Sequence, residues 1–227
     1  MSVGQPVPGR ARAPGRLELH LVTDSAQCGD RGVLQTARRA VAGGVSVVQV
    51  RDKTASAREF LELVTRIADT VGDRVPVLVN DRVDIFCAAR EQQAAVAGVH
   101  LGQDDLPAET ARRILGAESI IGLTASSRAQ LAAADSLPAG TVDYLGVGVV
   151  RATATKPDHP PTLGTDGFSA LAGATTLPCV AIGGIGAEDL PELRRGGAAG
   201  VAVVSAICAS ADPEGSARAL ADRWENG

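Results

Sequence analysis

Two kinds of segment alternate along the chain. Short, continuous runs of Val, Ile, Leu and Ala predict buried strands, and the longer segments between them, rich in Ala, Arg, Glu and Leu, predict helices. The predicted strands cover Leu17–Thr23, Val45–Val50, Val75–Val79, Ala97–Leu101, Ser119–Leu123, Val142–Gly146, Cys179–Ile182 and Gly200–Val204. The predicted helices cover Gly32–Ala42, Ala57–Val71, Val83–Ala89, Pro107–Leu115, Arg128–Ser136, Gly167–Gly173, Ala187–Arg195 and Pro213–Trp224.

This strict alternation of eight strands with eight helices predicts an α/β fold with a parallel sheet, because parallel strands are joined by helical crossovers. Eight units favour a closed (β/α)8 TIM barrel, and a doubly wound open sheet is the structural alternative. The length of 227 residues suits a single domain. We expect residues 1–16, rich in Pro, Gly and Arg, to be a disordered leader and residues 17–227 to form the barrel.

Composition narrows the classes of partner. Aromatic residues make up 2% of the chain and the net charge is −4, which argues against a nucleic-acid binder with stacking platforms or a basic surface. No apolar run is long enough to span a bilayer, and residues 1–16 lack the apolar segment of a secretory signal. The four cysteines form no Cys-x-x-Cys pair. We therefore expect a reduced, cytoplasmic protein with no membrane partner, and leave open whether it forms a homo-oligomer.

Polar side chains share one face at the end of the second predicted strand. Because side chains alternate along a strand, Gln49, Arg51 and Lys53 point to the face opposite the neighbouring valines, which in a barrel is the interior. Polar groups on an interior face are costly unless something pairs with them, so a ligand is expected there. If the strand end were simply exposed to solvent, the position of Lys53 would be explained, but the interior position of Gln49 would not. The chain contains only two lysines, Lys53 and Lys156, which suggests a task that Arg performs poorly.

Carboxylates follow the next two predicted strands. Asn80 and Asp81 close the third strand, and Asp105 lies shortly after the fourth. Two carboxylates at neighbouring strand ends can share Mg²⁺, with substrate phosphates and waters as further ligands. Helix capping is the competing explanation, since both Asp residues precede helices. His100, within the fourth strand, is expected to be a hydrogen-bonded core residue rather than a catalyst.

Further candidate chemistry follows the later strands. The irregular loop from Arg151 to Thr165 carries the hydroxyls of Thr153 and Thr155 and the second lysine, a set that suits a diphosphate, although an ordinary polar loop is the alternative. Gly183-Gly184 after the seventh strand and Val204-Ser205 after the eighth stand where barrels of this type bind phosphate. Glycine lets backbone N–H groups approach an anion. The alternative is that these glycines are needed only for tight turns. The expected ligands are therefore phosphorylated small molecules.

Together these segments resemble the thiamine-phosphate synthase family. The motifs that carry the resemblance run from about Leu19 to Ile207: Q-x-R-x-K, N-D, H-x-G-Q-x-D, G-x-G-x-x-x-x-T-x-T-K, and I-G-G-I followed by V-S-A-I. The resemblance implies an Mg²⁺-dependent transferase on a (β/α)8 barrel. Such an enzyme couples 4-amino-2-methyl-5-hydroxymethylpyrimidine diphosphate to 4-methyl-5-(2-hydroxyethyl)thiazole phosphate, giving thiamine phosphate and diphosphate.

The resemblance also implies a role for individual residues. The residues implied to hold the pyrimidine diphosphate are Gln49, Arg51, Lys53 and Asn80, and those implied to bind Mg²⁺ are Asp81 and Asp105. The residues implied to hold the diphosphate and the thiazole phosphate are Thr153, Thr155, Lys156, Gly184, Val204 and Ser205. Thr124 stands where the family usually has Ser, near the reacting centre. The residues expected to act in catalysis are Arg51, Lys53, Thr124 and Lys156.

The chain departs from the family pattern at a few positions. Val149 and Arg151 stand where many members have Pro and a Tyr-like residue, which affects the packing of the following loop. Thr124 keeps the hydroxyl of Ser but is β-branched and stiffer. The stretch from Ala88 to Ala97 is longer than usual, so we expect it to lengthen the third helix or its following loop.

Two competing functions remain open at this stage. A related thiazole tautomerase shares the fold, but its catalytic His would fall near Ser126, and it tends to lack the acid at Asp105. A non-catalytic sensor of phosphorylated ligands is the alternative from another class, because a fold alone does not determine function. Mg²⁺-dependent turnover would separate the synthase from the sensor.

Overall fold

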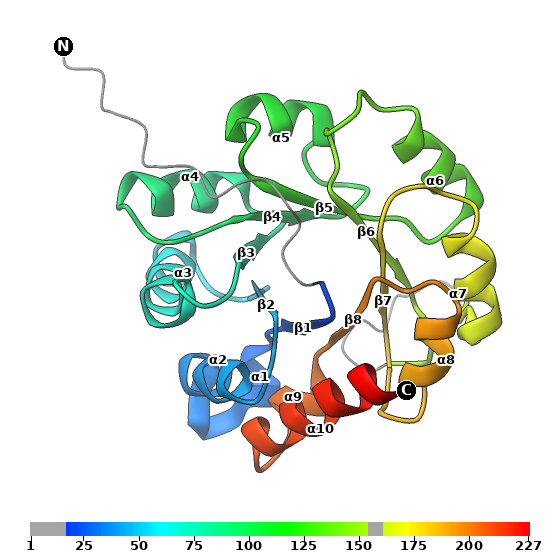
Figure 1. Cartoon of the computed structure of the whole chain (residues 1–227). Coiled ribbons are helices and arrows are strands. Elements are labelled where there is room, and N and C mark those ends of the chain that lie inside the picture. The colour runs from blue at the N-terminus through cyan, green and yellow to red at the C-terminus, as the bar shows by residue number, and fades with distance from the viewer. Residues whose placement is uncertain (1–16, 154–160) are drawn as a thin grey trace.

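The computed structural model describes residues 17–153 and 161–227; the predicted leader, residues 1–16, lies outside the described residues. In the described part, eight parallel strands close into a barrel in chain order, β1 to β8, and helices surround the ring (Figure 1). The predicted (β/α)8 barrel is confirmed, and the open doubly wound sheet is wrong. No helix in the described ranges has the length and apolarity needed to cross a membrane.

The strands are short and lie close to their predicted positions. They are β1 (Leu19–Val22), β2 (Val47–Val50), β3 (Val77–Asn80), β4 (Gly98–Leu101), β5 (Ile120–Thr124), β6 (Tyr144–Gly148), β7 (Cys179–Ile182) and β8 (Gly200–Val203). The largest difference is in β6, which begins and ends two residues later than the predicted Val142–Gly146. The predicted strand stopped at Gly146, whereas β6 continues to Gly148.

The helices include the predicted set and three additional single turns. The helices are α1 (Ser25–Cys28), η1 (Gly29–Arg31), α2 (Gly32–Ala42), α3 (Ala57–Val71), α4 (Val83–Glu91), α5 (Ala108–Leu115), α6 (Arg128–Asp135), α7 (Gly164–Ala172), α8 (Leu190–Arg195), α9 (Ser205–Cys208) and α10 (Pro213–Asn226). The turns α1, η1 and α9 were not predicted because a single turn shows no helical periodicity. Helix α4 runs two residues past its predicted end, as the longer stretch after Ala88 suggested.

Alternate residues of each strand enter two separate apolar layers. Val48 and Val50 of β2 lie between the barrel and its helices, in the larger cluster. Val47 lies inside the barrel with Leu78, Tyr144 and other residues of the smaller cluster. The predicted alternation along β2 is thereby confirmed, and it places Gln49, which is 4% exposed, on the interior face.

The barrel interior holds one large aromatic side chain next to glycines. Tyr144 is 1% exposed, and a Cβ atom added to Gly122 on β5 would lie 2.2 Å from its ring. The same Cβ would lie 2.5 Å from Nδ1 of His100, and one added to Gly146 would lie 2.9 Å from the His100 ring. These glycines therefore leave the room that Tyr144 and His100 occupy, which explains why β6 continues through Gly146.

Replacing Gly122 by Ala is expected to lower the free energy of unfolding by about 1–3 kcal/mol, because the added methyl group overpacks the ring of Tyr144. Urea denaturation followed by circular dichroism measures the change. Gly173→Ala is the matched control, since Gly173 has φ −72° and its Cβ would meet only an ordinary 3.4 Å contact. Equal urea midpoints for Gly122→Ala and Gly173→Ala would show that the Tyr144 ring moves aside without loss of stability.

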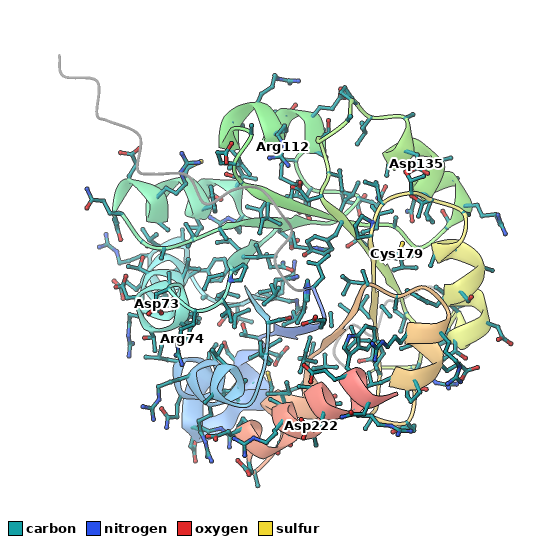
Figure 2. The ribbon with its side chains drawn as sticks, in the orientation of Figure 1. Asp73, Arg74, Arg112, Asp135, Cys179 and Asp222 are labelled. Atoms are coloured by element: carbon teal, nitrogen blue, oxygen red, sulfur yellow. The ribbon has the colours of Figure 1, made fainter. Side chains whose placement is uncertain are left out.

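A buried ion pair joins the loops at the opposite end of the barrel. Figure 2 looks onto the end where the strands begin, with Arg112 on α5 and Cys179 at the start of β7 labelled. Arg112 Nη2 donates to Asp143 Oδ2 at 2.7 Å. The same oxygen accepts the backbone N–H of Ile121 at 2.8 Å. The Arg112 guanidinium also donates to the carbonyls of Gly116 and Ser119 before β5. This pair therefore fixes the entry of two strands, far from the barrel mouth.

Candidate active site

A cavity of about 620 Å³ opens at the carboxyl ends of the strands, and every strand contributes to its wall. This is the end at which (β/α)8 barrels carry their active sites, and the volume suits ligands of substrate size. All the predicted site residues within the described ranges line it: Gln49, Arg51, Lys53, Asn80, Asp81, Asp105, Thr124, Thr153, Gly184, Val204 and Ser205. Thr155 and Lys156 lie outside the described residues. The structure brings these side chains together, and their individual roles stay predictions.

The end of β2 is held by the end of β1. The backbone N–H of Arg51 donates to Thr23 Oγ1 at 2.9 Å, and that hydroxyl donates to the Arg51 carbonyl at 3.1 Å. The Arg51 guanidinium contacts Asp24 Oδ2 at 3.2 Å, with about a fifth of each side chain exposed. Arg51 is therefore fixed against β1 and still borders the cavity.

Asp81 and Asp105 form a carboxyl pair beside Lys53. The Lys53 ammonium makes an ion pair with Asp81, and the side chains of Asp81 and Asp105 hydrogen bond to each other. Burial is the largest single influence and works to raise the pKa of Asp81, but the hydrogen bonds with Lys53 and Asp105 and the nearby Lys53 charge together lower the pKa. Burial and the neighbouring Asp81 raise the pKa of Asp105. The two carboxyl groups therefore differ in pKa, and Asp81 is the more acidic of the pair.

This pair is the group in the described residues that best fits a divalent cation. No cluster of three or more His, Cys, Asp or Glu side chains occurs in the described ranges. Mg²⁺ does not need such a cluster, because it binds through one or two carboxylates and completes its shell with phosphate oxygens and water. Asp105 is also held in place by the backbone N–H of Gly102 at 2.7 Å. The donors present therefore fit Mg²⁺ bound together with a phosphorylated substrate.

Asp81 adopts a backbone conformation that few side chains tolerate. Its φ is +61°, in the left-handed region, and its backbone N–H donates to the His100 carbonyl at 2.8 Å. Asp and Asn enter this region more readily than other non-glycine residues. The hydrogen bond to β4 and the left-handed turn together aim the Asp81 carboxylate at Asp105.

A line of polar side chains crosses the barrel interior below the cavity. His100 Nδ1 lies 2.9 Å from the Tyr144 hydroxyl, and His100 Nε2 lies 3.1 Å from Thr124 Oγ1. The Tyr144 hydroxyl also hydrogen bonds to the Gln49 side chain. Burial lowers the pKa of His100 to about 4, which Asp81 only partly offsets. Burial raises the pKa of Tyr144 well above its usual value. Both groups are therefore neutral near pH 7, and His100 is the hydrogen-bonded core residue that the sequence predicted.

The loops after β6 and β7 are tied together at the far side of the cavity. Gly184 has φ +62°, and a Cβ there would lie 2.5 Å from the Ala152 carbonyl, so only glycine allows this approach. Arg151 Nη2 donates to Asp189 Oδ1 at 2.7 Å, and Asp189 Oδ2 accepts the Gly186 N–H at 3.1 Å. Arg151, which departs from the family pattern, therefore braces the loops after β6 and β7.

The sequence placed the start of α8 too early. The predicted helix begins at Ala187, whereas α8 begins at Leu190. Asp189 was expected in its first turn, but its carboxylate is 4% exposed and binds Arg151 and the Gly186 N–H instead. A turn in residues 186–189 is needed for this arrangement, so the helix starts later.

Several polar residues of the cavity wall were not assigned a role in the site from the sequence. They follow β4 and β5 and include Gln103, Asp104, Ser126 and Gln130. The backbone N–H of Ser126 donates to Gln130 Oε1 at 2.8 Å, which orders the turn after β5. Examining every polar residue just beyond a predicted strand would have found the first three, because all strand ends meet at the mouth of a barrel.

Comparison with known proteins identifies relatives across most of the chain. The model of a family described as thiamine monophosphate synthase matches residues 19–207. The thiamine-phosphate synthase of Psychrobacter sp. (strain PRwf-1) is 42% identical over 204 residues, which cover 90% of this chain and 93% of that protein. The thiamine-phosphate synthase of Corynebacterium efficiens is 48% identical over 188 residues, which cover 83% of this chain and 87% of that protein.

Solved structures show similarity at two levels. The thiamine phosphate pyrophosphorylase from Pyrococcus furiosus superposes with a TM-score of 0.79 at 28% identity, covering 92% of this chain and 96% of that chain. A 3-hexulose-6-phosphate synthase superposes with a TM-score of 0.68 at 15% identity, covering 91% of this chain and 99% of that chain. The second likeness concerns the fold alone.

Proposed function

The chain belongs to the thiamine monophosphate synthase family, and from this premise we propose how its cavity performs the reaction of a thiamine-phosphate synthase. The reaction couples 4-amino-2-methyl-5-hydroxymethylpyrimidine diphosphate to 4-methyl-5-(2-hydroxyethyl)thiazole phosphate. The observation that carries the assignment to this site is the convergence of Arg51, Lys53, Asp81 and Asp105 in one cavity at the barrel mouth. A pyrimidine diphosphate needs this combination of cations and paired carboxylates.

The chemistry is a transfer of the pyrimidinylmethyl group from oxygen to nitrogen. The carbon–oxygen bond to diphosphate breaks, and the aminopyrimidine ring stabilises the cation that remains. The thiazole nitrogen then donates its electron pair to the methylene carbon, which forms the carbon–nitrogen bond. The thiazole nitrogen carries no proton, so the cavity needs no strong base. The main task of the protein is to stabilise the negative charge that develops on the leaving diphosphate.

We assign this task to the cations at the end of β2. Arg51 and Lys53 border the same cavity, and Arg51 is held by Asp24 and the end of β1. Lys53 pairs with Asp81, so it lies next to the proposed metal ligands. Mg²⁺ bound by Asp81 and Asp105 would supply Lewis-acid stabilisation to the diphosphate oxygens. From the sequence, Lys156 and Thr155 are proposed to join them when substrate binds.

We further propose that the thiazole phosphate binds on the opposite side of the cavity. Gly184, Val204 and Ser205 line that wall, and Gly184 adopts the left-handed conformation, with φ +62°. Thr153 borders the space between the two phosphate sites. In this arrangement Gln49 and Asn80 face the pyrimidine and Thr124 lies near the reacting carbon. The expected partners are therefore phosphorylated small molecules. A cytoplasmic location, the absence of nucleic-acid partners and a homo-oligomer stay predictions.

A diphosphate-release assay tests this function. Purified protein is incubated with both substrates, or with either one alone, in Mg²⁺ or in EDTA. We expect release only with both substrates and Mg²⁺, with thiamine phosphate formed in equal amount. Release in EDTA would contradict the proposed metal site. No release under any condition would contradict the proposed function and leave the tautomerase and the sensor as the remaining alternatives.

A further inference from the structure

The polar line across the barrel connects two side chains that both border the cavity. It begins at Gln49 on β2, passes through Tyr144 on β6 and His100 on β4, and ends at Thr124 on β5. Gln49 and Thr124 line the cavity, whereas Tyr144 is 1% exposed and lies among apolar residues. Gly122 and Gly146 leave room for the two rings in the middle of the line. Two strand positions are occupied by glycine to make room for this buried network, which suggests that the side chains at its two ends have a function.

The direction of the hydrogen bonds in this line follows from the acidity of its members. A neutral imidazole has one N–H donor and one acceptor nitrogen. A phenol is a stronger donor than an imidazole N–H, and an imidazole nitrogen is a stronger acceptor than a phenol oxygen. Tyr144 therefore donates to His100 Nδ1, and the His100 proton lies on Nε2. That proton is donated to Thr124 Oγ1, at the 3.1 Å separation observed.

Both ends of the line are then fixed as well. The Tyr144 oxygen accepts from the Gln49 amide nitrogen, so the Gln49 carbonyl oxygen is left to accept from a ligand. Thr124 Oγ1 accepts from His100, so its own proton is left for donation into the cavity. One end therefore presents an acceptor and the other a donor. A reversed line would exchange these two roles at both ends together.

We propose that His100 and Tyr144 are positioning residues that orient the Thr124 hydroxyl as a donor, and the Gln49 amide as an acceptor, toward the pyrimidine substrate. The proposal rests on the proposed function and concerns the recognition of that same substrate. An aminopyrimidine carries both an amino donor and ring-nitrogen acceptors, so it matches a cavity with one acceptor and one donor. The line also keeps Thr124, which is β-branched, in a single orientation beside the reacting centre.

A double-mutant cycle tests whether Tyr144 acts through Thr124. Tyr144→Phe keeps the ring in its space but removes the hydroxyl, and Thr124→Val keeps the shape but removes the other end of the line. We expect Tyr144→Phe to lower kcat by about 10-fold, the loss of one buried hydrogen bond, with the KM for the thiazole phosphate unchanged. In the Thr124→Val background, Tyr144→Phe is expected to have no further effect on kcat. Losses that multiply in the double variant would overturn the proposal.

Conservative replacements separate positioning from folding. His100→Gln places an amide N–H near the position of Nε2 and is expected to keep most of kcat, whereas His100→Leu loses it. Thr124→Ser keeps the hydroxyl but loses the stiff β-branched side chain, and it is expected to retain more of kcat than Thr124→Val. Urea midpoints for all variants show whether a loss comes from unfolding. If His100→Gln and His100→Leu lose kcat equally while both remain folded, the donor role of His100 is wrong.

The direction of the line can be measured without substrate. Nitrogen-15 NMR of the parent protein distinguishes the Nε2–H from the Nδ1–H tautomer, and the chain has only three histidines, so loss of one signal in His100→Gln assigns it. We expect the Nε2–H tautomer. The Nδ1–H tautomer would overturn the proposal whether or not the enzyme couples its substrates. An inactive parent protein with the Nε2–H tautomer would instead contradict the proposed function and, with it, the substrate named for the line.

Discussion

Replacing Asp81 by Asn is expected to lower kcat/KM for diphosphate release by about 100- to 1,000-fold, because the change removes charge from the proposed Mg²⁺ site and weakens the hold on Lys53. Asp81 is the member of the carboxyl pair whose pKa is lowered, through the hydrogen bond from Lys53. It therefore carries the negative charge that the metal needs. The concentration of Mg²⁺ for half-maximal activity is expected to rise in the same variant.

Asn is the informative replacement at this position for a structural reason. Asp81 has φ +61°, and Asn tolerates the left-handed region whereas Ala is strained there. A loss in Asp81→Asn therefore reports the charge rather than the turn. Asp84→Ala is the matched control, because Asp84 is an exposed acid that pairs with Arg82 in the same segment. Diphosphate release as a function of Mg²⁺ concentration measures both variants, and equal metal requirements would show that Asp81 is not a ligand.

Replacing Asp143 by Ala is expected to lower the free energy of unfolding by about 3–5 kcal/mol, the usual cost of removing one partner of a buried ion pair. The Asp143 and Arg112 side chains are 6% and 14% exposed. Without Asp143, the Arg112 charge loses its counterion and the Ile121 N–H loses its acceptor. A group that remains unpaired in the interior bears the full cost of its lost hydration.

Urea denaturation measures this loss, and turnover provides the second readout. Asp143 lies at the end of the barrel opposite the cavity, so kcat per folded molecule is expected to stay unchanged at low temperature. Asp84→Ala serves as the control here too, since removal of an exposed ion pair costs at most about 1 kcal/mol. A change of the same size in both variants would show that the Arg112–Asp143 pair does not stabilise the fold.

Most of the architecture could be predicted from the sequence because each strand is a short apolar run between two helices. The alternation along β2 placed Gln49 on the cavity side, since successive side chains of a strand point to opposite faces. Arg51 and Lys53 lie just beyond the end of β2 and also border the cavity. The boundaries of β6 were less accurate. The predicted strand stopped at Gly146, whereas β6 continues to Gly148; Gly148 packs directly against the backbone of Ile182 on β7, a contact that only the tertiary structure reveals.

The candidate site, like the fold, could be predicted from the sequence only in part. Residues directly after a strand, such as Asp81 and Ser205, could be found because all strand ends of a barrel meet at one mouth. The brace between Arg151 and Asp189 could not be found, since its members are far apart in sequence and look like an ordinary loop cation and a helix-capping acid. The tautomer that the line from Gln49 to Thr124 requires depends likewise on contacts between four different strands.

The sequence by itself determined the order of strands and helices, the face on which each strand residue lies and the motifs of the family, because these depend on neighbours along the chain. The tertiary structure decided which carboxyl groups lie together, which cation each acid binds and which hydroxyls meet the two nitrogens of His100. Those pairings depend on distances across the barrel, and burial then sets the protonation of the groups that meet there.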